Sequence, residues 1–294
     1  AVRGPNDAIR VFADEPMFGT DFDTMEISTG PSSANIGSGF GPPGSGAASD
    51  EPRMNTVVRH WFNFLSVGMP TQGVGCSDTH RLHDFPPGYS RTYVPAIPER
   101  PYGDIAALEM DGRSPRHGDN LVTNGPWMTV RVGEFGAGQM VPPLDGEVTL
   151  DVSVEVAAWM HPPPEAIEVF VNNTYVQPAD TASNRAMNPA YTAELVYETA
   201  DLDNGGKVQR ASAQFPLAVE QDAWVVVRLI GSGNLFPLLP ANVTLDAEGD
   251  TPATLVTEAV GGPRPFAVSN PIFIDADADG VWTAPFADGA FVGE

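Results

Sequence analysis

The stretch Gly73-Val74-Gly75-Cys76-Ser77-Asp78-Thr79-His80 is a short apolar run that ends in polar residues. It predicts a buried strand whose C-terminal end carries Asp78 and His80. In extended backbone, residues two positions apart point to the same side. The carboxylate and the imidazole can therefore face one point, as half of a metal site or as an acid/base pair. A loop histidine beside a capping aspartate is the alternative.

A helix is predicted directly before this strand. Its apolar positions repeat with helical spacing, and Gly68 and Pro70 end the pattern. The repeating positions are Val57, Val58, Trp61, Phe62 and Leu65. A helix, a short loop and a buried strand with a polar end are typical of an α/β barrel or a parallel sheet, in which chemistry lies at the C-terminal ends of strands.

A second strand is predicted further upstream. Residues 22–28 alternate between apolar and polar types, and Glu26 lies near the end of this run. Glu26 is a site candidate there, with a solvated carboxylate at an edge or in a loop as the alternative. Residues 29–53 are rich in Gly, Pro and Ser, which predicts a long loop of functional or partly disordered character.

The pattern of apolar and polar residues changes from about residue 124 onwards. Short alternating runs recur at near-regular spacing with Gly- and Asn-rich turns between them, and the run at 148–156 is the clearest. This pattern predicts an antiparallel β-sandwich over 124–294. We therefore expect an α+β chain of two regions, with an α/β region over 1–120 before the sandwich.

The charge balance excludes some classes of partner. The chain of 294 residues has a net charge of −23, which disfavours binding to nucleic acid and to anionic lipid surfaces. No apolar run approaches the length of a membrane span. Cys76 is the single cysteine, so an internal disulfide is excluded, and a small buried side chain is the default interpretation. The first residues lack the features of a signal peptide.

Further polar residues follow Asp78 and His80. His83 is a candidate metal ligand or general acid/base, with a simple loop residue as the alternative. Arg81 and Arg91 are candidates for binding an anionic substrate, because a guanidinium pairs with phosphate or carboxylate through two hydrogen bonds. Both arginines could equally pair with the many acidic residues of the chain.

A separate acidic motif lies near the C-terminal end. Asp275, Asp277 and Asp279 alternate with alanine and precede Gly280, which matches the first half of a calcium-binding loop. The glutamate expected at the twelfth position would fall at Phe286 and is absent. The motif predicts a structural Ca²⁺ site or, alternatively, a solvated acidic turn.

Four stretches together resemble the last third of a PHP-type metallohydrolase of the carbaryl-hydrolase-like branch. They are Phe22–Ile27, Trp61–Gly68, Gly75–His80 and Pro87–Val94. Residues 122–127 and 270–275 are similar to the C-terminal β-region of that branch.

The resemblance implies the C-terminal fragment of a (β/α) barrel with a metal centre at its strand ends. Asp78 and His80 would be ligands of a divalent transition metal (Zn, Mn or Fe), and Glu26 a weaker one. Metal-activated water would then hydrolyse a phosphoester, ester or carbamate. The His-x-His motif with which that family begins is absent, so we expect a partner chain or segment, N-terminal in origin, to complete the barrel. Such a partner would also cover the apolar face of the predicted helix.

A non-catalytic interaction module built on the sandwich, stabilised by Ca²⁺, is the alternative function. The acidic composition and the calcium-like loop favour a periplasmic, cell-surface or secreted location for either function. Oligomerisation is left open.

Overall fold

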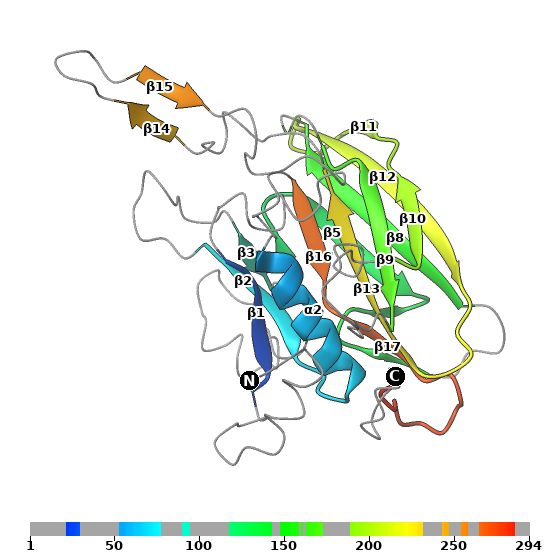
Figure 1. Ribbon diagram of the computed structural model, residues 1–294. Coiled ribbons are helices and arrows are strands. Elements are labelled where there is room, and N and C mark those ends of the chain that lie inside the picture. Colours follow the sequence, from blue (N-terminus) through cyan, green and yellow to red (C-terminus); the bar gives the residue numbers. More distant parts are fainter. Residues whose placement is uncertain are drawn as a thin grey trace.

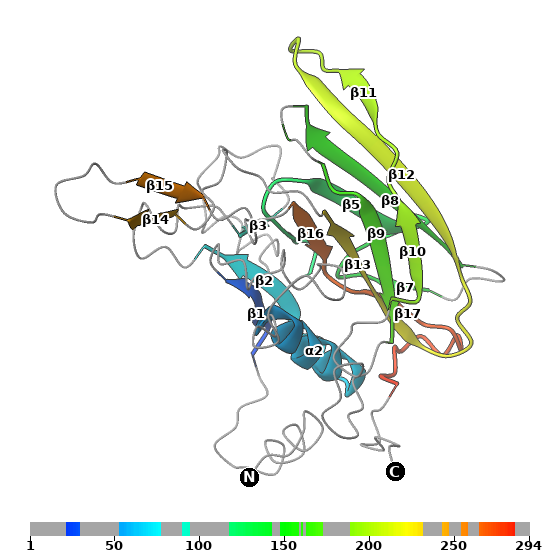
Figure 2. The ribbon, with the colours of Figure 1, turned by 45° about the horizontal axis from the view of Figure 1, so that its top comes forward.

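The computed structural model describes residues 22–29, 53–77, 90–94, 118–142, 148–158, 160, 163–172, 189–231, 243–246, 254–257 and 265–285. Most strands in these ranges form two facing layers (Figures 1 and 2). Helix α2 (Arg53–Ser66) and the parallel strands β1 (Thr24–Thr29) and β2 (Gln72–Cys76) lie on the outer side of one layer. The molecule is therefore a β-sandwich with one β-α-β unit packed on its outside.

The first layer is an eight-stranded sheet in the order β10-β9-β13-β16-β4-β3, with β17 pairing with both β13 and β7. Only β7 and β17 pair in parallel; the other pairs are antiparallel. The strands are β3 (Arg91–Tyr93), β4 (Leu121–Thr123), β7 (Met140–Val141), β9 (Ala166–Val171), β10 (Tyr191–Glu194), β13 (Ala223–Ile230), β16 (Phe266–Ser269) and β17 (Ile272–Ile274).

The second layer is a five-stranded antiparallel sheet in the order β11-β12-β8-β5-β6. Its strands are β5 (Trp127–Val132), β6 (Phe135–Gly136), β8 (Val148–Ala157), β11 (Glu198–Asp201) and β12 (Lys207–Leu217). A separate hairpin joins β14 (Val243–Asp246) to β15 (Thr254–Thr257).

The alternation in β8 decides which side of this sheet faces the core. Every second residue from Val148 to Val156 is buried, and the residues between them are exposed or half-buried. The buried side chains pack against the inner face of the first sheet, including Val225, Val227 and Leu229 of β13. The strand predicted over 148–156 is therefore confirmed, with the period of two that a half-buried strand requires.

Strand β13 differs because both of its faces are covered. Seven of its eight residues are buried. Val225 and Val227 belong to the core between the sheets, whereas Trp224 and Val226 belong to a second core on the other side. A strand that is buried on both faces has a continuous apolar sequence instead of an alternating one.

Helix α2 supplies the other half of this second core. Trp61 and Phe62 are 0% and 1% exposed, and the Phe62 ring lies 4.8 Å from the ring of Trp224 and 5.3 Å from that of Phe170. The apolar helix face, which the sequence analysis expected a partner to cover, packs on the chain's own sheet. Binding of a partner chain elsewhere stays a prediction.

The prediction of a (β/α)-barrel fragment in an α+β fold is wrong. The described residues are nearly all β, with antiparallel sheets, a single helix and no closed barrel. Among the described residues, no further strand pairs with β2. Side chains form hydrogen bonds to the backbone groups on the edge of β2 that faces away from β1. The Gly73 N–H donates to Asn270 Oδ1 (2.5 Å), and Asn270 Nδ2 donates to the Gly73 carbonyl (3.1 Å). The Gly75 N–H donates to Thr92 Oγ1 (2.8 Å).

The boundary predicted near residue 120 does not separate two cores in the described residues. Helix α2 and strand β3 precede it, yet α2 packs on β13 and β3 pairs with β4. The loop predicted over 29–53, apart from its two end residues, lies outside the described residues. In the part of the chain that the structure describes, no helix is long and apolar enough to cross a membrane.

Tyr197 gives a prediction for alkaline pH. Its hydroxyl is buried and has no hydrogen-bond partner among the described residues, and burial raises the pKa of Tyr197 above its usual value. The folded state therefore holds this proton more tightly than the unfolded chain does, so the free energy of unfolding should fall as the pH rises above about 10. We expect Tyr197→Phe to weaken this loss and to be neutral or stabilising at pH 7. Urea unfolding of both proteins at pH 7 and 10.5 measures it, and equal pH dependence would contradict it.

Candidate metal centre

Asp275 follows directly after β17 and organises the acidic loop. Its side chain is buried at 1% exposure. Oδ1 accepts the Ala278 N–H and Oδ2 accepts the Gly280 N–H, both at 2.9 Å. The loop can turn around this carboxylate because Ala278 and Gly280 adopt positive φ angles of 69° and 84°. Gly280 thus has the sharp-turn role that the motif predicts.

Asp222 approaches the same place from β13. In the antiparallel pairing of β13 with β17, Ala223 lies opposite Ile274, so the preceding Asp222 comes beside Asp275. Asp222 is 7% exposed. Its Oδ1 accepts the Ala276 N–H (2.8 Å) and its Oδ2 accepts the Thr283 N–H (2.6 Å). It therefore holds both ends of the loop.

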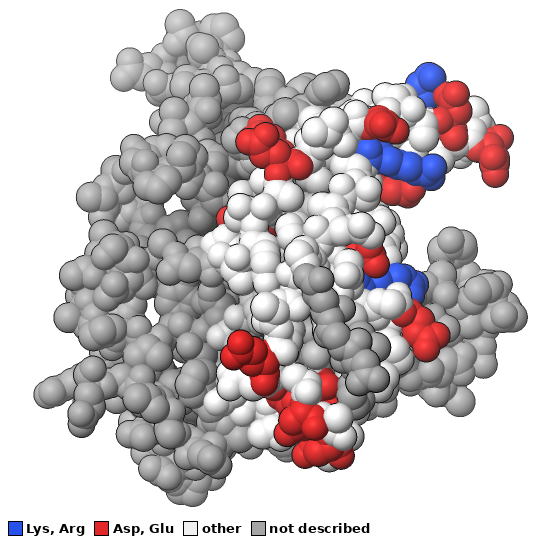
Figure 3. All heavy atoms as spheres, turned by 90° about the vertical axis from the view of Figure 1, so that its right-hand side faces the viewer, with Lys and Arg blue, Asp and Glu red and all other residues white. Residues whose placement is uncertain are grey.

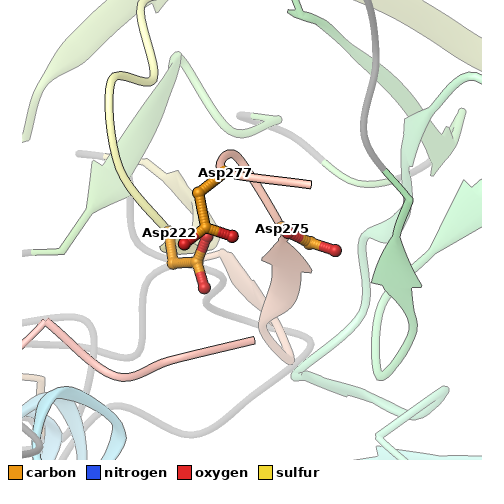
Figure 4. Close-up of side chains that lie close together, drawn as sticks. All are labelled: Asp222, Asp275 and Asp277. Carbon is orange, nitrogen blue, oxygen red and sulfur yellow. The ribbon is translucent and has the colours of Figure 1, made fainter. Parts of the chain in front are cut away.

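Asp277 completes a group of three carboxylates with Asp222 and Asp275. One oxygen from each residue lies within 4.8 Å of the others. Figure 4 shows the side chains of Asp277 and Asp222 pointing toward one another, with Asp275 beside them at the end of its strand. These three residues could hold a metal ion.

The chemistry of the group favours a cation. Three negative charges at this separation repel one another, and the repulsion is stronger where side chains are withdrawn from water. An ionised carboxylate offers about four acceptor positions, so the two N–H bonds to each buried aspartate leave positions for a metal. All the side-chain atoms that could ligate a metal in this group are oxygens, which hard cations prefer.

The sequence motif is thus confirmed in part. Asp275 and Asp277 belong to the group, whereas Asp279 does not; its Oδ1 accepts the Val281 N–H (2.8 Å) within the turn. The sequence did not indicate Asp222 as a candidate ligand, because it lies more than fifty residues before the motif and no local motif includes it. Only the pairing of β13 with β17 brings it there.

Trp282 attaches the end of the loop to the sandwich. Its indole N–H donates to the Ala223 carbonyl (3.1 Å), and its ring packs on Phe273 with centroids 4.7 Å apart. Val281 and Trp282 are not part of a strand. The loop is nevertheless joined to β13 at both of its ends, by Asp222 and by Trp282.

The predicted hydrolase residues are only partly accounted for. Asp78, His80, Arg81 and His83 lie outside the described residues. Arg91 lies on β3, where Nη1 donates to the Tyr93 hydroxyl (3.2 Å) and Nη2 donates to the Asn124 carbonyl (3.4 Å). Both contacts are to the chain itself.

Cys76 is the last residue of β2, and Glu26 lies in the middle of the neighbouring strand β1. The Cys76 thiol donates to Glu26 Oε1 (2.8 Å), and both side chains are exposed. Cys76 is therefore at the surface, contrary to its default interpretation as a buried residue, because the alternation of β2 places it on the outer side after buried Gly75.

The described surface is acidic in the way the composition predicts. On the face in Figure 3, acidic side chains outnumber basic ones. Two of the basic groups are paired at the surface, Lys207 with Asp201 (2.8 Å) and Arg210 with Glu155 (2.6 Å). Such a surface attracts cations and repels polyanions.

Comparison with known proteins identifies no relative. No protein-family model matches the chain, and neither a curated protein nor a solved structure is similar to it. The resemblance to PHP-type hydrolases stays a prediction. The geometry of Asp222, Asp275 and Asp277 is therefore the basis for a functional proposal.

Proposed function

We propose that this chain is an extracellular structural or interaction module, built on the β-sandwich and stabilised by Ca²⁺. The observation that carries the proposal is the meeting of Asp222, Asp275 and Asp277 between two paired strands. Bound Ca²⁺ would neutralise their charge and hold the loop after β17 against the start of β13. Its role would be structural, because the site joins two elements of the sandwich.

The ligand set supports Ca²⁺ over a transition metal. Zinc and iron sites in proteins usually include histidine or cysteine, and the group contains neither. Ca²⁺ takes six to eight oxygen ligands in flexible geometry, so carbonyl groups and water can complete three carboxylates. Extracellular modules bind Ca²⁺ with dissociation constants of about 10⁻⁴–10⁻³ M. A secreted, periplasmic or cell-surface location would fit this range.

Calcium should raise the thermal stability of the metal-free protein. At free Ca²⁺ one hundred times the Kd, the expected gain is about 2.7 kcal/mol, which raises the Tm of a domain of this size by roughly 5–10 °C. Protein stripped with EDTA and dialysed is titrated with CaCl₂ and followed by calorimetry, with MgCl₂ as the comparison. No shift with Ca²⁺ would refute the site.

Two substitutions in the same loop separate specific binding from general charge. Asp277→Asn removes one ligand charge at an exposed position, so the fold should survive and the response to Ca²⁺ should be lost. Asp279→Asn removes the same charge two residues away, outside the group, and should keep the response. Equal loss in both variants would indicate non-specific screening.

A metal-dependent hydrolase is the second candidate. The observation in its favour is a parallel strand pair joined by a helix, in which Cys76 at the C-terminal end of β2 donates to exposed Glu26 of β1. The C-terminal ends of parallel strands are where α/β enzymes place their chemistry. Asp78 and His80 follow β2 directly in the sequence. An N-terminal partner segment would complete this site. Elemental analysis of the assembled protein should show less Zn, Mn or Fe in Asp78→Ala/His80→Ala, and unchanged metal content would refute this candidate.

A further inference from the structure

A cleft opens where the two sheets separate beside β5. Its volume is about 460 Å³, within the range of roughly 300–1,000 Å³ for small-molecule sites. The lining comes from the start of β4, the edge of β5 and the turn between β6 and β7. The residues that matter here are Asn120, Trp127, Thr129, Arg131 and Gln139. The cleft is separate from the aspartate group, whose residues are not part of its lining.

Trp127 presents a partly exposed indole ring on the wall of this cleft. It is 42% exposed, although burial of an indole is favourable. Tyr93 packs edge-on against it, with centroids 5.8 Å apart and planes at 78°. Arg91 supports Tyr93 in turn, with its guanidinium 5.6 Å from the ring and Nη1 donating to the hydroxyl. Trp127 is thus held in place while one apolar surface stays open to solvent.

Asn120 places an unsatisfied acceptor on the same wall. Its side chain is 2% exposed. Nδ2 donates to the Gly73 carbonyl (3.0 Å), whereas Oδ1 has no hydrogen-bond partner among the described residues. A buried acceptor without a partner costs about 1–3 kcal/mol. This oxygen is itself closed to solvent, so contacts with a ligand come from the exposed polar groups around it.

Further polar groups line the cleft around the exposed indole ring. Gln139 uses its oxygen to accept the Gly136 N–H (2.7 Å), which leaves its NH₂ group as a donor. Arg131 donates Nη1 to the Glu134 carbonyl (3.1 Å) and keeps further N–H groups. Thr129 contributes a hydroxyl between them on β5. The cleft therefore combines the apolar ring of Trp127 with hydrogen-bond donors and acceptors.

We propose that this cleft binds a neutral saccharide. The apolar face of a pyranose ring would lie on Trp127, and its hydroxyls would accept hydrogen bonds from Arg131 and Gln139. A purely apolar ligand would leave these polar groups unpaired, and the net charge of −23 disfavours a polyanion.

Native affinity electrophoresis tests the proposal. The full chain is run through gels that contain hydroxyethylcellulose, xylan, galactomannan, laminarin or soluble starch, with alginate as the anionic comparison. We expect retardation by at least one neutral polysaccharide. Retardation by none of them, or by alginate alone, would overturn the proposal.

Variants then locate the binding surface. For the retarding polysaccharide, Trp127→Ala should weaken binding about tenfold or more, and Trp127→Phe should weaken it less. Gln139→Ala, at a second exposed position, should weaken binding about fivefold. Lys207→Ala, at an exposed ion pair that is not part of the cleft lining, is the control and should bind as the parent does. Binding by a folded Trp127→Ala protein equal to that of the parent would refute the site.

Discussion

Replacing Trp224 by alanine should lower the free energy of unfolding by about 3–5 kcal/mol, the usual cost of deleting a large aromatic side chain from a core. Trp224 is 0% exposed and lies on the face of β13 that α2 covers. Its ring packs 4.8 Å from Phe62, and its indole N–H donates to Ser66 Oγ (3.0 Å). The substitution removes the contacts of the helix with the sheet as well as the buried area.

Urea unfolding at equilibrium measures this change, and hydrogen exchange of the α2 amides reports on the helix itself. Trp127→Ala is the matched control, because it deletes the same side chain from an exposed position. It should cost clearly less than Trp224→Ala, because 42% of Trp127 is already exposed to water. Similar losses in the two variants would contradict the assignment of Trp224 to the interface between helix and sheet.

Removing Glu168 should destabilise the chain by about 1.5–3 kcal/mol, the usual worth of a hydrogen bond to a charged group, because it deletes a carboxylate that a buried guanidinium contacts. Glu168 and Arg228 lie directly opposite each other on β9 and β13, with side chains 15% and 6% exposed. Arg228 Nε donates to Glu168 Oε2 (2.6 Å), and the guanidinium lies 5.1 Å from the Phe170 ring.

The double variant Glu168→Leu/Arg228→Met tests what the ion pair itself contributes to stability. Apolar replacement of a whole buried ion pair is often neutral or stabilising, so the double variant should be more stable than Glu168→Ala. Urea unfolding of the three proteins checks this order. A double variant less stable than Glu168→Ala would show that the pair itself is strongly stabilising.

An exposed ion pair in the other sheet supplies the control. Arg210 and Glu155 are also direct neighbours on paired strands, but their side chains are 51% and 42% exposed. Water and salt screen such a pair, so Glu155→Ala should cost less than about 1 kcal/mol. The comparison holds the cross-strand geometry constant and changes the burial.

The sequence by itself determined the elements whose signals are local. The period of two over 148–156 predicts β8, and the helical spacing around Trp61 predicts α2. The D-x-D-x-D-G motif predicts the turn in which Asp275 accepts the N–H groups of its own loop. The strand, the helix and the turn each depend on interactions between residues a few positions apart, and such interactions can be predicted from the local sequence.

Only the tertiary structure decided which elements meet. A strand, a helix and a second strand are compatible with either a barrel or a single β-α-β unit, and the difference is the neighbour of β2. Asn270, almost two hundred residues away, occupies that edge at Gly73. The packing of α2 on Trp224 and the position of Asp222 beside Asp275 depend in the same way on strand pairing. Pairing between distant strands is set by the burial and hydrogen bonding of the whole chain, and no local pattern specifies it.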